Sequence, residues 1–157
     1  QTRDQSHNPV WFMVRKKRIT ASNFGRFYSR QSVDRRFLDD IYNRKPFTSP
    51  AIQYGKNCEN EGKRAYYRVT GNHVHPVGFV VHPDLPFLGA SPDGVVCDDG
   101  KLGLLEVKCP YSLRYISIKE GLARQVAGVS CLGKEGGVTR LRKSHDYYFQ
   151  IQGQILV

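Results

Sequence analysis

Apolar residues recur at helical spacing in four segments, which are therefore predicted helices. These segments are residues 11–18, 35–42, 52–70 and 145–157. A further helix is expected to run through Phe24 and Phe27, with the hydroxyl of Thr20 or Ser22 satisfying the free amides of its first turn. Gly71 tolerates the left-handed conformation of a helix C-cap and marks the end of the helix over 52–70.

The middle of the chain has the alternation that is typical of strands. Four segments are predicted to be extended: 73–82, 87–90, 94–97 and 102–108. The cluster at 98–100 predicts a hairpin turn, Pro110 ends the last strand, and 112–123 is helical in composition. The remaining connections are predicted turns or loops: 46–50, 83–86 and 127–137. Helices at both ends around a group of strands predict one α/β domain over residues 1–157.

The amino-acid composition indicates which kind of partner to expect. The chain has 157 residues, enough for one domain, and 39% of them are hydrophobic, enough to bury a single core. Its 24 Lys and Arg against 14 Asp and Glu give a formal net charge of +10. This imbalance favours a polyanionic partner such as nucleic acid. The alternative is a solvated basic surface that only keeps the protein soluble.

The cysteines and the apolar runs indicate the cellular compartment in which the protein is expected. The four cysteines form no CxxC pair and have no His at zinc-finger spacing, so free intracellular thiols are expected. No secretory signal is recognisable, and runs such as 77–81 are too short to cross a bilayer. We therefore expect a soluble intracellular protein without a membrane partner, in either nucleus or cytoplasm. Since the chain starts at Gln1 and stops within a helical pattern at Val157, it is expected to be a trimmed piece.

The main chemical candidates are Asp93, which follows Pro92, and Glu106 and Lys108, which lie after twelve intervening residues. Residues i and i+2 of a strand share a face, so Glu106 and Lys108 point the same way and Val107 points into the core. Two carboxylates at adjacent strand ends offer oxygen ligands to Mg²⁺, and the carbonyl of Val107 could add another. The alternatives are a turn aspartate that bonds its own backbone and a solvated strand edge.

This pattern resembles the signature of PD-(D/E)xK nucleases, and three further motifs resemble the lambda-exonuclease or YqaJ recombinase family. The first places Gly55, Glu59 and Tyr66 on the preceding helix, so the resemblance makes Glu59 a third acidic residue of the site. Glu61 faces elsewhere, because residues two apart on a helix do not share a face. The alternative reading of Glu59 is a solvated helix carboxylate beside Lys63.

The second motif is the N-terminal run from Trp11 through Arg15 to Ser22. In the family the equivalent Arg and Ser bind a DNA end phosphate, and a guanidinium with a hydroxyl at a helix start suits such an anion. The alternative is a capping Ser with a surface Arg.

The third motif, residues 145–152, resembles the family's closing helix, which carries a Gln beside the metal site. Gln150 takes that position, and the core face is expected from the set at i, i+4 and i+8: Tyr147, Ile151 and Ile155. The alternative is a simple buried amphipathic helix.

The resemblance spans Trp11 to Leu156 and implies a restriction-endonuclease-like α/β core, with a central mixed sheet flanked by helices. It implies a metal-dependent DNA exonuclease that digests linear duplex DNA from 5′ to 3′ in recombination or repair. Mg²⁺ is the expected cofactor, with Mn²⁺ as a substitute and two ions at the site. Double-stranded DNA ends are the expected partner; a single-strand annealing protein and a homo-oligomer stay open. The alternatives are an endonuclease, a catalytically inactive DNA-binding module and a structural adaptor.

Overall fold

In the computed structural model, which describes residues 1–43 and 47–157, the longest helix is α4 (Pro50–Thr70). Ser49 caps its start, accepting a hydrogen bond of 3.2 Å from the backbone amide of Ile52. Gly71 ends it with φ of 75°. The predicted helix over 52–70 and its stop at Gly71 are therefore confirmed. Of the predicted loop over 46–50, Pro46 lies outside the described residues, and α4 already begins at Pro50.

The other helices are shorter and lie near their predicted positions. They are α1 (Pro9–Lys16), α2 (Phe24–Tyr28), α3 (Arg35–Tyr42), α5 (Ile118–Ala123) and α6 (Asp146–Leu156). Single 3-10 turns occur at η1 (Gln5–His7), η2 (Ala21–Asn23), η3 (Tyr111–Leu113) and η4 (Ala127–Val129). The capping role expected for Thr20 or Ser22 is wrong, since neither hydroxyl accepts from a helix amide. The two hydroxyls instead bond each other at 2.9 Å.

The described strands form two small sheets and a separate hairpin. The mixed sheet has the order β1 (Ile19–Thr20), β4 (Leu88–Ala90), β3 (Val80–Val81), with β1 parallel and β3 antiparallel to β4. The antiparallel sheet has the order β2 (Val74–His75), β5 (Gly94–Asp98), β6 (Lys101–Leu105). The hairpin joins β7 (Leu132–Glu135) to β8 (Val138–Leu141). The α/β class and its mixed sheet are confirmed.

Several predicted boundaries are wrong for local reasons. The strand over 73–82 is divided between the two sheets at Pro76, which has no amide hydrogen to give to a ladder. The helical segment over 112–123 is interrupted at Ser117, whose hydroxyl caps α5. The segment over 127–137, predicted to be a loop, contains β7. The sequence does not predict this strand, because the exposed hairpin lacks the alternation of apolar and polar residues. The predicted strand over 102–108 stops at Leu105.

Helix α6 packs a different face from the one its apolar residues predict. Ile155 is 65% exposed, so the expected core face fails at that position. The buried residues are Gly153 and Gln154. A Cβ atom on Gly153 would lie 2.6 Å from the ring of Phe24, so the helix approaches α2 where only hydrogen fits.

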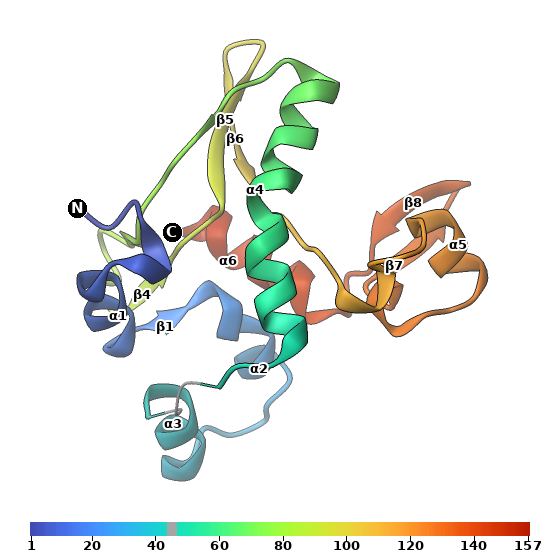
Figure 1. Cartoon of the computed structure of the whole chain (residues 1–157). Helices are drawn as coiled ribbons and strands as arrows, with labels where there is room; N and C mark the ends of the chain where they lie inside the picture. Colours follow the sequence, from blue (N-terminus) through green and yellow to red (C-terminus); the bar gives the residue numbers. More distant parts are fainter. Residues whose placement is uncertain (44–46) are drawn as a thin grey trace.

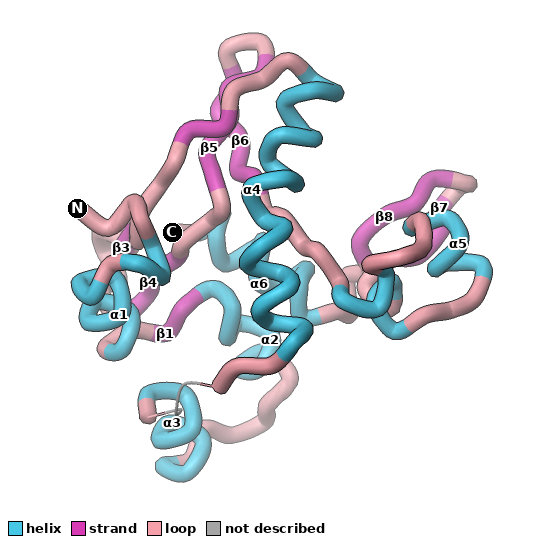
Figure 2. Tube along the Cα trace, in the orientation of Figure 1, coloured by secondary structure: helices cyan, strands magenta, loops and turns pink. Residues whose placement is uncertain are grey.

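These elements surround α4, which crosses the middle of the molecule (Figure 1). Figure 2 shows α1 and the mixed sheet on one side of α4, and α5 with the β7–β8 hairpin on the other. Between these two groups of elements, the lower ends of β5 and β6 approach α6. Within the described residues, no helix combines the length and the apolar character that crossing a membrane requires.

Candidate active site

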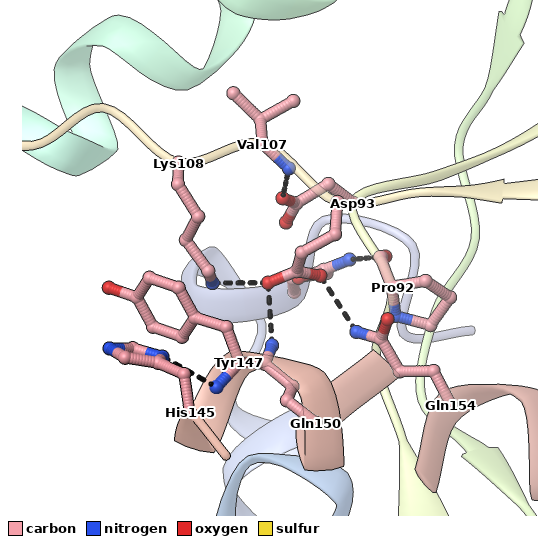
Figure 3. A network of polar contacts seen from close by, with 10 residues as sticks. Pro92, Asp93, Val107, Lys108, His145, Tyr147, Gln150 and Gln154 are labelled. Carbon is pink, nitrogen blue, oxygen red and sulfur yellow. Dashed lines mark hydrogen bonds and ion pairs between the residues drawn. The ribbon is translucent and has the colours of Figure 1, made fainter. Parts of the chain in front are cut away.

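Asp93 lies directly before β5 and is fastened to the end of β6. Its backbone amide donates to the carbonyl of Leu105 at 3.0 Å. Its Oδ2 atom accepts a hydrogen bond of 2.6 Å from the backbone amide of Val107 (Figure 3). Gly94 and Leu105 form the last residue pair of the β5–β6 ladder, and these two bonds extend that ladder to Asp93. The pattern of the two strands therefore places Asp93 beside the segment that carries Glu106, as the sequence predicts.

Glu106 and Lys108 form an ion pair through Oε1 and Nζ, although β6 ends before either residue. The Glu106 side chain is 11% exposed and that of Lys108 is 36% exposed. Val107 points to the other side, where a Cβ atom on Gly62 would lie 2.5 Å from its Cγ1 atom. The predicted alternation is thus confirmed, and Gly62 leaves the space that lets α4 cover Val107.

Two glutamines of α6 hold the carboxylate of Glu106. The Nε2 atom of Gln150 donates to Oε1 at 2.5 Å, and the Nε2 atom of Gln154 donates to Oε2 at 2.7 Å. Figure 3 shows both side chains reaching from the helix toward the strand ends. Gln154 is missing from the residues predicted from sequence. Its spacing of four residues from Gln150 puts both amides on one helix face and could have revealed it.

The carboxyl group of Asp93 lies in an environment with an excess of negative charge. Burial, followed by the neighbouring charge of Glu106, raises the pKa of Asp93 from 3.8 to about 6. The hydrogen bond from Val107 and the charge of Lys108 oppose this rise, whereas Glu59 adds to it. A cation placed beside Asp93 would remove this electrostatic cost.

The predicted meeting of three carboxylates is not formed. Among residues 1–43 and 47–157, no three His, Cys, Asp or Glu side chains are grouped as ligands for one ion. The Oε1 atom of Glu59 instead accepts from Nζ of Lys63 at 2.6 Å. This ion pair forms because the two residues lie one turn apart on α4. Glu61 faces elsewhere, as predicted, and binds Arg64 and Arg68.

The donor set near Asp93 still fits a divalent metal ion. Carboxylate oxygens are the ligands that Mg²⁺ prefers, and a carboxylate can accept more contacts than those Glu106 makes. Burial and the charges of Glu106 and Glu59 raise the pKa of Asp93 more than the Val107 hydrogen bond and the charge of Lys108 lower it. Asp93 and Glu106 would hold such an ion, with the carbonyl of Val107 as a further oxygen donor.

A small pocket of about 160 Å³ lies on the α6 side of this site. Its wall is formed by Trp11, Arg15, Thr20, Ala21, Ser22, Ser91, Gln150 and Gln154. The structure thus brings the predicted pair Arg15 and Ser22 together, and it does so beside the glutamines that hold Glu106. Trp11 and Ser91 complete the pocket and were not predicted as site residues.

Arg15 is positioned in this pocket by an aromatic ring and a hydroxyl. Its guanidinium lies 4.0 Å from the centre of the Trp11 ring and donates to the Oγ atom of Ser91 at 3.4 Å. Trp11 donates to the same Oγ atom at 2.9 Å. Burial lowers the pKa of Arg15 to about 10, so the group stays positive at neutral pH. A partly desolvated guanidinium in a small polar pocket suits a phosphate group.

Comparisons with known proteins identify the family and the fold. The model of the YqaJ-like viral recombinase domain matches residues 10–157. A crystal structure of LHK-Exo in complex with dAMP is 25% identical, with a TM-score of 0.67. A crystal structure of the alkaline exonuclease LHK-Exo from Laribacter hongkongensis is also 25% identical, with a TM-score of 0.64. Each comparison covers 95% of this chain and 68% of the other.

No curated protein matches the sequence. The family match nevertheless covers all but the first nine residues, and the two solved structures share the restriction-endonuclease-like fold over nearly the whole chain. The chain belongs to the YqaJ-like viral recombinase family.

Proposed function

We propose that the protein is a DNA exonuclease that hydrolyses phosphodiester bonds at the 5′ ends of linear double-stranded DNA. One observation carries this proposal: the pocket of Arg15 and Ser22 shares Gln150 and Gln154 with the carboxylate of Glu106. A terminal phosphate held in that pocket would place the first nucleotide beside Asp93 and Glu106. Cutting there releases one nucleotide at a time and leaves a 3′ single strand, the substrate of recombination.

The residues of the site have separate roles in this proposal. Asp93, Glu106 and the carbonyl of Val107 would hold Mg²⁺, for which Mn²⁺ could substitute, and Glu59 would help to hold a second ion. Bound there, the divalent ions supply Lewis-acid chemistry that polarises the phosphodiester. Lys108 orients the attacking water and offsets charge that grows on the scissile phosphate. Gln150 holds the Glu106 carboxylate and donates a second amide hydrogen toward a phosphate oxygen.

The similar structures support an exonuclease within this family. One is called an alkaline exonuclease, and the other contains dAMP, a mononucleotide of the kind that exonuclease digestion releases. The net charge of +10 supports a DNA substrate. A single-strand annealing protein and a second copy of the chain are the partners that this activity would use.

The test uses end-labelled linear duplexes with and without a 5′ phosphate, and a closed circular duplex as the control. We expect Mg²⁺-dependent release of mononucleotides from the phosphorylated linear DNA, no cutting of the circle, and loss of activity with EDTA. Cutting of the circle would replace the proposal with an endonuclease. Binding of DNA without any cleavage in Mg²⁺ or Mn²⁺ would replace it with an inactive binding module.

A further inference from the structure

A larger cleft of about 670 Å³ has Asp93 in its lining and shares no lining residue with the Arg15 pocket. One wall is residues 3–7 of the N-terminal segment, and the other is a face of α4 that includes Glu59. Pro76, Val77 and Asp93 complete the lining. The matched family domain begins at residue 10, so it includes none of the N-terminal wall. The Arg15 pocket does not use these residues.

The α4 wall is a continuous polar stripe. It consists of Gln53, Lys56, Asn57, Asn60 and Lys63. Their spacing of three and four residues puts them on one face of the helix. Amide and ammonium groups at this spacing offer a row of hydrogen-bond donors beside the catalytic carboxylates.

The N-terminal wall is fastened to the loop before Asp93. The Nε2 atom of Gln5 donates to the carbonyl of Val77 at 3.1 Å and to that of Pro92 at 2.9 Å. The hydroxyl of Thr2 accepts from the backbone amide of Phe79 at 2.8 Å. The cleft is therefore bounded by two anchored walls, and Gln5 fixes one of them to the residue next to Asp93.

Some charged side chains of the cleft form ion pairs and others do not. Lys63 is paired with Glu59, and Asp4 adds one carboxylate to the N-terminal wall. Within the described part of the chain, no carboxylate lies within ion-pairing distance of Arg3 or Lys56, one on each wall. Two unpaired cations across a polar cleft suit a ligand that carries spaced negative charges.

We propose that this cleft binds the sugar-phosphate backbone of the cleaved strand on the 3′ side of the scissile bond, with Arg3 and Lys56 contacting successive phosphates. The inference rests on the proposed function, because the Arg15 pocket and this cleft then hold the strand on either side of Asp93 and Glu106. Its volume lies in the range of small-molecule sites, which suits a short stretch of single strand rather than a duplex. The N-terminal segment is thereby part of the DNA-binding surface.

The test compares two 5′-phosphorylated substrates with the wild-type chain and with the double variant Arg3→Ala and Lys56→Ala. One substrate is a dinucleotide, which ends before the cleft, and the other is a single strand of about ten nucleotides, which fills it. The double variant should lower kcat/KM about tenfold on the longer strand, mainly through KM. It should leave the dinucleotide unchanged.

The matched control removes the same charges elsewhere, through Arg35→Ala on α3 and Lys101→Ala on the β5–β6 hairpin, and should match the wild type. Two lost phosphate contacts should also flatten the salt dependence of binding, reducing the log–log slope by about 1.4 for single-stranded DNA. The variant Arg3→Lys with Lys56→Arg keeps both charges and should restore binding.

The outcomes separate this inference from the proposed function. An equal loss on both substrates, or a result matching the control variant, would overturn the inference while the exonuclease activity stands. Failure of the wild-type chain to release mononucleotides from a 5′-phosphorylated linear duplex, tested beside these substrates, would overturn the proposed function itself. A salt slope that the double variant leaves unchanged would contradict phosphate contacts at these two residues.

Discussion

Gln154 donates a hydrogen bond of 2.7 Å from its side-chain amide to Oε2 of Glu106, although the two residues lie 48 positions apart. Only 6% of Gln154 is exposed, so this amide is committed to the carboxylate rather than to solvent. Together with Gln150, it fixes the plane of the Glu106 carboxylate from α6. The final helix therefore helps to build the candidate active site.

We expect Gln154→Ala to lower kcat by about 10- to 100-fold with little change in KM, because Oε2 of Glu106 loses its partner and the carboxylate is then held at Oε1 alone. Gln152→Ala on the exposed face of α6 is the control and should have no effect. Isothermal titration with Mg²⁺ should show weaker metal binding in the Gln154 variant alone. Unchanged kcat and metal affinity would show that the hydrogen bond only serves packing.

Lys108→Ala should reduce cleavage by about 100-fold or more while DNA binding stays measurable, since the role proposed for the ammonium group is to act on the scissile phosphate. Its ion pair with Glu106 is not a major part of the fold, because Gln150 and Gln154 still hold that carboxylate. The measurement is single-turnover cleavage beside fluorescence anisotropy with labelled DNA. Full activity in this variant would refute the role given to Lys108.

Arg15→Ala should slow digestion of 5′-phosphorylated ends by about tenfold and leave unphosphorylated ends nearly unaffected, because the role proposed for the guanidinium is to bind the terminal phosphate. Ser22→Ala should show a weaker effect in the same direction. The measurement is the ratio of kcat/KM for the two kinds of end. A ratio equal to that of the wild type in both variants would place the terminal phosphate elsewhere.

Asp93→Asn should stabilise the chain above about pH 6 when EDTA is present. The folded state raises the pKa of Asp93 from 3.8 to about 6, so ionisation of this carboxylate lowers the free energy of unfolding. This cost is absent below about pH 4, grows between pH 4 and 6, and is complete above pH 6. The asparagine oxygen still accepts from Val107 without the charge.

Thermal unfolding in EDTA should therefore give Asp93→Asn a Tm a few degrees above the wild type at pH 8, with the difference vanishing at about pH 4. Mg²⁺ should raise the Tm of the wild type and have little effect on the variant, since only the wild type keeps both carboxylates. A wild type that is the more stable protein in EDTA at pH 8 would contradict the charge excess around Asp93.

Gly153→Ala should destabilise the fold by about 1–3 kcal/mol, because the new Cβ would lie 2.6 Å from the Phe24 ring. The smaller side chain of Phe24→Leu should recover part of the loss in the double variant. Gly100→Ala tests a different effect. A Cβ atom at Gly100 would have no atom within 4 Å, so only the positive φ of 76° makes alanine unfavourable there. Urea unfolding measures all three, and a double variant no better than Gly153→Ala would argue against the contact.

Sequence patterns predicted the longest helix, the hairpin at 98–100 and the opposed directions of Glu106 and Val107. Each depends on neighbours along the chain: a capping residue, a turn-forming cluster or the alternation of a strand. Other predictions failed for local reasons that the pattern of apolar and polar residues does not show. Thr20 and Ser22 bond each other, and Pro76 sends two halves of one predicted strand to different sheets.

By itself, the sequence determined the α/β class and the spacing of Asp93, Glu106 and Lys108, because adjacent strands joined by a short hairpin must place these residues together. Only the tertiary structure decided that Gln154 contacts Glu106. It also decided that the N-terminal segment and a face of α4 line one cleft together with Asp93. These relationships depend on how helices pack against the strand ends, and side-chain contacts between such distant segments leave no periodic signal in the chain.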